Sequence, residues 1–171
     1  NDGYVRIWDP TTGDVRHEMF GHTYAVHSVA VSPDSAFVVT GSSDATARIW
    51  DAMSGAELRV LAGHAYSVVS VAISPDAAFV VTGSFDQTVR IWDAASGAEL
   101  RVLDHSGSAW APLRAIEVSP DGTYLVTGTA DRAWIWDMAS GALRHVLAYN
   151  PDVMVDYWNY YTHSIAVSPD S

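Results

Sequence analysis

The sequence predicts an all-β protein built from copies of one four-stranded antiparallel unit. Three observations support this prediction. The pair Trp-Asp recurs at 8–9, 50–51, 92–93 and 136–137, with spacings of 42, 42 and 44 residues. The tripeptide Ser-Pro-Asp starts at 32, 74, 119 and 168. Between these anchors lie short runs rich in β-branched and aromatic residues, separated by turn residues, which are typical of strands.

The first two expected strands lie at about 4–8 and 15–19. The first of them, Tyr4 to Trp8, ends at the first Trp-Asp pair. A strand-like run stands very near the start of the chain, and no Met begins it. We therefore expect the chain to be an internal fragment of a longer protein.

The middle copy gives the pattern of a whole unit most clearly. Its four expected strands are 68–73, 79–82, 88–92 and 99–103. Consecutive valines in the second strand lack polar alternation, which indicates a strand covered on both faces. Pro75 suits the second position of a type I turn, so Ser-Pro-Asp is expected to join the first two strands. The stretch at 79–84 also occurs unchanged at 37–42 and loosely at 124–129.

Two further features complete the repeat. A Gly-His pair follows the preceding Trp by 14 residues at 21–22 and 63–64, and an Asp precedes the next Trp by five or six residues at 44, 86 and 131. With these features nearly the whole chain resembles the WD40 repeat family. The resemblance implies a β-propeller in which each four-stranded unit is one blade.

The strand count predicts an arc of a propeller. With strands lettered a to d from the axis outward, the chain supplies c and d, three complete blades and one a strand near 163–167. A closed ring would lack a b strand, so we expect an arc of a larger propeller; the alternative is two copies joined edge to edge. The expected divisions are a partial blade at 1–22, blades at 23–62, 63–104 and 105–148, and an aromatic loop with the first strand of a further blade at 149–171.

The resemblance also implies a buried hydrogen-bonded set of four side chains in each blade. In the first two complete blades the set is His22, Thr40, Asp44 and Trp50, then His64, Thr82, Asp86 and Trp92. The third blade keeps Thr127, Asp131 and Trp136, but its His105 follows Asp104 instead of Gly, so this set is expected to be incomplete or distorted. Recurrence at the blade period favours an architectural role over a catalytic dyad.

Departures from the repeat lie in the loops that join one blade to the next. The distance from the last apolar residue of a blade to the next Ser-Pro-Asp is 13, 13, 16 and 21 residues, and five of the 19 aromatic residues fall within 149–161. We hypothesise a top-face site for a protein or peptide. Its residues are Tyr24, Tyr66, Phe85, Trp110, Tyr157, Trp158 and Tyr160. The alternative is that the long loop packs its own aromatic residues over the blades.

Composition excludes several classes of function. The chain has no Cys, and all nine basic residues are Arg, so a thiolate metal site, a Schiff-base lysine and a phosphate-binding loop with Lys are excluded. A net charge of −11 argues against nucleic acid as a partner. No apolar run is long enough to span a membrane. We therefore predict no cofactor, no metal, no membrane insertion and no enzymatic activity.

The predicted function is a non-catalytic protein–protein interaction scaffold. It would bind partner proteins or peptides through the top-face loops, as a subunit of a larger assembly and together with the remaining blades of the same propeller. The predicted location is intracellular, in the cytoplasm or on the cytoskeleton. The alternative is a regulatory or sensor propeller within a larger multidomain protein that contains an enzyme.

Overall fold

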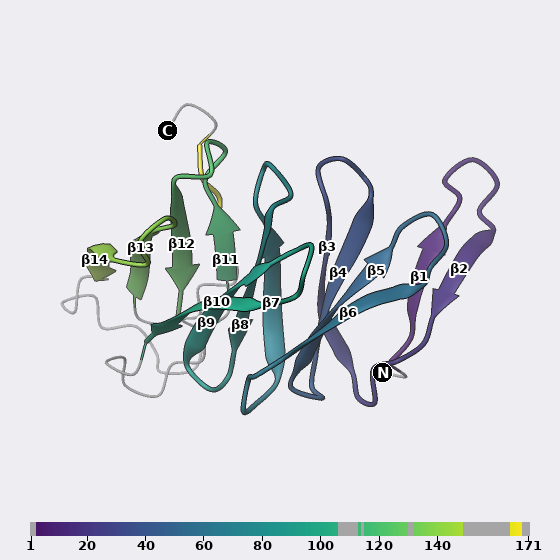
Figure 1. Ribbon diagram of the computed structural model, residues 1–171, viewed down its shortest axis with the longest axis horizontal. Helices are drawn as coiled ribbons and strands as arrows, with labels where there is room; N and C mark the ends of the chain where they lie inside the picture. The colour runs from purple at the N-terminus through teal and green to yellow at the C-terminus, as the bar shows by residue number, and fades with distance from the viewer. Residues whose placement is uncertain (1–2, 106–112, 114, 130–131, 149–164, 169–171) are drawn as a thin grey trace, which may run out of the picture.

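The computed structural model describes residues 3–105, 113, 115–129, 132–148 and 165–168. Its strands form one pair and three complete four-stranded sheets, all antiparallel (Figure 1). The pair is β1 (Val5–Trp8) with β2 (Val15–Met19). The first complete sheet is β3 (Val26–Val31), β4 (Phe37–Ser42), β5 (Thr46–Asp51) and β6 (Glu57–Ala62). The second is β7 (Val68–Ile73), β8 (Phe79–Ser84), β9 (Thr88–Asp93) and β10 (Glu99–Asp104). The third is β11 (Ala115–Val118), β12 (Tyr124–Gly128), β13 (Arg132–Asp137) and β14 (Leu143–Ala148).

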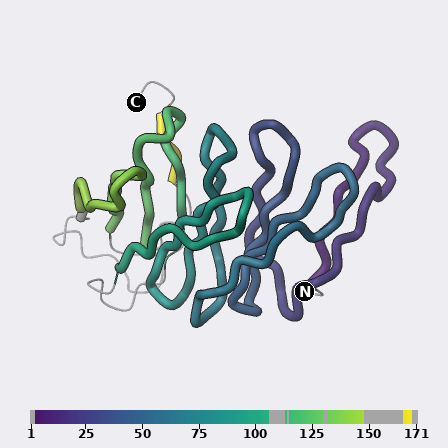
Figure 2. Tube along the Cα trace, in the orientation of Figure 1, coloured from purple at the N-terminus to yellow at the C-terminus, as the bar shows by residue number. Residues whose placement is uncertain are grey.

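The sheets follow one another in chain order along a curved row (Figures 1 and 2). Within each complete sheet the strand order is the chain order, and β7 contacts both β3 and β11. The first strands of the sheets therefore line one side of the arc, and the fourth strands lie farthest from it.

The predicted all-β fold of three complete four-stranded antiparallel sheets, with a partial sheet before them, is confirmed. The strand expected near 163–167 is not formed in the part of it that the structure describes, because residues 165–168 carry no strand. A strand needs a hydrogen-bonded neighbour, and none of the described strands pairs with this segment.

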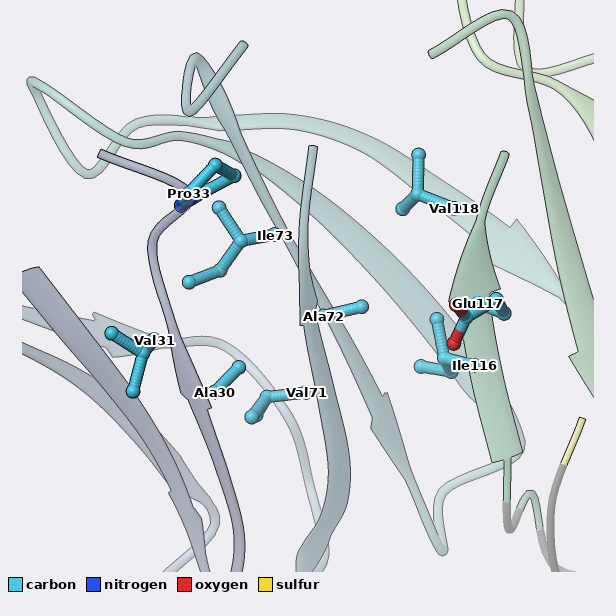
Figure 3. Close-up of a pocket in the computed structure, with 9 residues that line it drawn as sticks. All are labelled: Ala30, Val31, Pro33, Val71, Ala72, Ile73, Ile116, Glu117 and Val118. Atoms are coloured by element: carbon cyan, nitrogen blue, oxygen red, sulfur yellow. The ribbon is translucent and has the colours of Figure 1, made fainter. Parts of the chain in front are cut away.

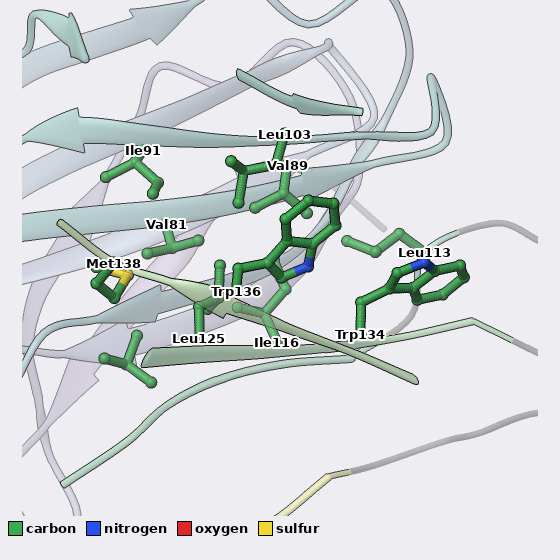
Figure 4. Close-up of a cluster of buried hydrophobic side chains, with 11 residues drawn as sticks. Val81, Val89, Ile91, Leu103, Leu113, Ile116, Leu125, Trp134, Trp136 and Met138 are labelled. Carbon is green, nitrogen blue, oxygen red and sulfur yellow. The ribbon is translucent and has the colours of Figure 1, made fainter. Parts of the chain in front are cut away.

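The core lies between neighbouring sheets. One cluster joins the first complete sheet to the second through side chains such as Val39, Leu61 and Val71. A second cluster, which includes Trp136, joins the second sheet to the third (Figure 4). All residues of β4 after Phe37 are buried, so this strand needs no polar alternation.

The Ser-Pro-Asp turns join the first two strands of each complete sheet, as predicted. In the first, the backbone N–H of Ser35 donates to the carbonyl of Ser32 at 2.8 Å. The Asp34 carboxylate accepts from the Ser32 hydroxyl at 2.6 Å and from the Ala36 N–H at 3.0 Å. These bonds fix the end of the sheet opposite to the Gly-His loops.

Candidate functional site

In the first complete sheet the structure brings together the four side chains of the expected set. His22 lies in the loop between β2 and β3, and its Nδ1 is 2.8 Å from Oδ2 of Asp44. Its Nε2 is 2.7 Å from the hydroxyl of Thr40 on β4. The indole N–H of Trp50 on β5 donates to that same hydroxyl at 2.8 Å. The loop, two strands and the turn between them are thereby held by one network.

The bonding partners fix the protonation state of His22. Ionised Asp44 can only accept, so Nδ1 carries the proton and donates it. The Thr40 hydroxyl accepts from Trp50, which leaves its own proton for Nε2. His22 is therefore the neutral Nδ1–H tautomer.

Burial has opposite consequences for the two titratable members of this set. Desolvation is the main reason that the pKa of His22 is lowered, and it outweighs the favourable interaction with Asp44. Burial also acts to raise the pKa of Asp44, but hydrogen bonds from Thr46, His22 and the backbone of Thr23 together lower it below its ordinary value. The pair is a neutral imidazole beside a carboxylate.

The second complete sheet repeats the arrangement. His64 is 2.9 Å from Asp86 through Nδ1 and 2.8 Å from the Thr82 hydroxyl through Nε2. The Trp92 indole donates to Thr82 at 2.8 Å. The pKa of Asp86 is lowered, because its hydrogen bonds, of which the bond from His64 is the largest, outweigh desolvation. The two networks are equivalent in geometry.

The third complete sheet keeps half of the network among the residues that the structure describes. His105 Nε2 is 2.7 Å from the Thr127 hydroxyl, which also accepts from Trp136 at 2.9 Å. The Nδ1 of His105 is buried and forms no hydrogen bond of good geometry with any residue that the structure describes. Desolvation lowers the pKa of His105 to about 4, against smaller opposing effects of the Leu103 backbone and the Asp104 charge. Asp131 lies outside the described residues.

The Gly of each Gly-His pair lies tightly against the end of a neighbouring arginine side chain. A Cβ on Gly21 would overlap the guanidinium of Arg48 and crowd the ring of Trp50. Arg48 forms an ion pair with Glu57 on β6, and Gly63 lies against Arg90, which pairs with Glu99.

The third sheet has other residues in place of this glycine, arginine and glutamate. It has no Gly before His105, and Trp134 and Leu143 occupy the positions of the arginine and glutamate. The Trp134 ring lies 4.8 Å from the His105 ring in an edge-on arrangement. The replacement is visible when the three copies are compared residue by residue, whereas the recurring motifs alone do not indicate it.

The described members of the predicted binding site are exposed at one end of the sheets. Tyr24 and Tyr66 are each 65% exposed, and Phe85 is 44% exposed. The Ser42 hydroxyl donates to the Tyr24 carbonyl at 3.1 Å, and Ser84 holds the Tyr66 carbonyl at 2.9 Å. We call this end the His-loop face; it is the lower side of the arc in Figure 1. The other candidates, Trp110, Tyr157, Trp158 and Tyr160, lie outside the described residues.

The family described as WD domain, G-beta repeat matches residues 13–51, 55–93 and 97–137. The chain belongs to the WD40 repeat family. Each match ends at the Asp of a Trp-Asp pair, and the three matches together cover more than half of the chain. No curated protein matches the chain. Domains built of WD40 repeats typically serve as protein-interaction scaffolds and are usually non-catalytic.

Two exposed aromatic residues near the first WD40 blade were missed by the sequence analysis. The rings of Tyr4 and Phe20 meet edge to face with centroids 4.9 Å apart, and both are exposed. Gly3 lies against the backbone carbonyls of His22 and Tyr24, so this pair borders the His-loop face. The sequence pattern gave little indication of these two residues, because neither recurs at the blade period.

The β1–β2 pair leaves apolar surface uncovered. Trp8 is 56% exposed, whereas Trp50, Trp92 and Trp136 at the equivalent positions are buried. On the facing side of β3, Val29 and Val31 are also exposed.

The described residues contain no group of three or more His, Asp or Glu side chains arranged to hold a metal ion. Within the same residues there is no helix long and apolar enough to cross a membrane.

Proposed function

We propose that this WD40 domain is a non-catalytic scaffold that binds a partner protein or peptide on its His-loop face. The observation that carries the proposal is the matched pair of Tyr24 and Tyr66. Each residue is 65% exposed, yet a serine hydroxyl anchors the backbone of each at the same point. Exposed aromatic rings on fixed loops bind partners at a low cost in conformational entropy.

Phe85 extends the proposed surface, and Tyr4 with Phe20 lies at its border. Trp110, Tyr157, Trp158 and Tyr160 belong to the same proposal on sequence grounds, because they fall in the two lengthened loops between blades.

The burial of the His–Asp pairs supports a non-catalytic role. The side chain of His22 is fully buried and that of Asp44 nearly so, and the same holds for His64 and Asp86. Substrate would have no access to an acid–base pair in this state. We therefore assign the four-residue sets to the architecture of the blades.

The uncovered surfaces of Trp8, Val29 and Val31 support a second part of the proposal. Further blades of the same propeller would cover them, and the whole would act as a subunit of a larger assembly inside the cell, in the cytoplasm or on the cytoskeleton. The alternative is a regulatory propeller within a larger protein that also contains an enzyme. In that case an enzyme would be part of the same protein, and the propeller would use the same binding face.

The proposal is tested by comparing the proteins retained by the immobilised wild-type chain and by the double variant Tyr24→Ala/Tyr66→Ala. Partners specific to the His-loop face should be lost from the double variant. The matched control is Met53→Ala, because Met53 is 86% exposed at the opposite end of the blades. An unchanged set of partners on the double variant, with an unchanged melting temperature, would contradict the proposal.

A further inference from the structure

A cavity of about 240 Å³ lies between the first strands of the three complete blades (Figure 3). Its walls are formed by β3, β7 and β11, the strands that line one side of the arc. Most lining residues are aliphatic, among them Ile73, Ile116 and Val118, and Pro33 lies at one end. The volume is below the roughly 300–1,000 Å³ of typical small-molecule pockets and suits a single side chain.

Of the described residues that line this cavity, Glu117 is the one ionisable residue. It departs from the repeat. Ala30 pairs with Val39, and Ala72 pairs with Val81; Glu117 pairs in the same way with Val126. The equivalent residues of the other two complete blades are therefore alanines, so the blade architecture does not require a carboxylate at this position.

No hydrogen bond or ion pair joins the Glu117 carboxylate to any residue that the structure describes. The residue is partly buried, and this burial raises its pKa. A carboxylate that is partly removed from water loses hydration, and a nearby cation compensates for this loss. Glu117 is therefore suited to form an ion pair with a cationic group of another molecule.

We propose that this cavity receives the basic side chain of a partner protein, with the cationic head group paired to Glu117. The aliphatic stem of an Arg or Lys would contact the aliphatic side chains that line the cavity, as such stems do on protein surfaces. The net charge of −11 favours the approach of a basic segment. This inference rests on the proposed scaffold function and names the chemistry of one contact, at a site distinct from Tyr24 and Tyr66.

The test is a titration of the chain with the peptide Ac-Gly-Gly-Arg-Gly-Gly-NH₂, followed by the methyl NMR signals of Ala72, Ile73 and Val118. The matched probe replaces Arg by citrulline, which has the same shape and no charge. The Arg peptide should shift these signals and bind about tenfold more tightly than the citrulline peptide. Glu117→Gln should remove this difference. Glu117→Ala, which restores the residue of the other blades, serves as a second variant that is expected to fold.

The Tyr24→Ala/Tyr66→Ala variant should bind the Arg peptide like the wild type, which separates this inference from the proposed function. No shift at the cavity, equal affinity for the two peptides, or undiminished binding by both Glu117 variants would overturn the inference.

Discussion

One threonine hydroxyl in each complete blade holds two buried rings. Thr40, Thr82 and Thr127 are fully buried, and each bonds a histidine nitrogen and a tryptophan N–H. The resemblance to the WD40 family predicted that these residues form a hydrogen-bonded set, and repetition at the blade period located the equivalent residues in each copy. It could not reveal that the Nδ1 of His105 lies buried without a good partner among the described residues, since that depends on the local path of one loop.

Replacing Thr82 by valine should lower the free energy of unfolding by about 2–4 kcal/mol, because the change leaves both His64 and the Trp92 indole unpaired in a buried site. The variant has nearly the same shape as the wild type, so loss of packing contributes little. Urea unfolding measures the change. Thr82→Ser keeps the hydroxyl and should cost clearly less; equal losses in the two variants would show that the hydrogen bonds are not the cause.

His105 should make stability depend on pH. Its pKa is 6.5 in the unfolded chain, and desolvation lowers it to about 4 in the folded one. Between these values only the unfolded chain takes up the proton. The contribution of the neutral ring is therefore complete above pH 6.5 and is lost as the pH falls towards 4, by about 3 kcal/mol in total.

The measurement is the free energy of unfolding between pH 4.5 and 7.5 for the wild type and His105→Gln. The wild type should lose stability more steeply on acidification, because His22 titrates in both proteins and cancels in the comparison. Parallel curves would contradict a neutral buried His105.

At the scale of secondary structure, the turns are the parts best predicted from sequence, and they still contain strain. Ser35 and Ala77 follow Ser-Pro-Asp with φ of 59°, and Gly122 takes the same place with φ of 71°. Proline and aspartate predict the turn. The left-handed residue after them follows from the backbone geometry of the hairpin, and only one of these three copies has the glycine that suits it.

Ala77→Gly should raise the free energy of unfolding by about 0.5–1 kcal/mol, since it relieves a left-handed conformation that costs a residue with a Cβ. Gly122→Ala is the matched opposite change, and a Cβ there would meet only ordinary contact with Pro75. Thermal unfolding should give shifts of opposite sign. Shifts of the same sign would show that the turn conformation does not decide the effect.

At the scale of the whole molecule, arginine side chains join one blade to the next. Arg59 on β6 donates through Nε and Nη2 to the carbonyl of Ala95 in the next blade, at 3.1 and 2.8 Å. Arg101 donates through Nη2 to the carbonyl of Ala139. In the sequence these arginines stand at equivalent positions of two repeats, which is compatible with either a solvated or an inter-blade position. Their role depends on how two sheets are placed side by side, which no local pattern determines.

Arg59→Met should lower the free energy of unfolding by about 1 kcal/mol, because an exposed but bidentate contact between blades is lost while the aliphatic stem is kept. The control is Arg16→Met, whose ion pair with Asp9 stays within the β1–β2 pair and should contribute less. Chemical denaturation compares them, and an equal effect of both changes would argue against a role of Arg59 between blades.

The central claim is that the buried His–Asp sets build the blades while the exposed aromatic rings of the His-loop face bind the partner. Its most direct test is the Kd of a captured partner for the wild type and for Tyr24→Ala/Tyr66→Ala, measured by calorimetry. Two aromatic anchors at the centre of an interface predict about a 100-fold weaker affinity, with an unchanged melting temperature. An unchanged Kd would contradict the claim.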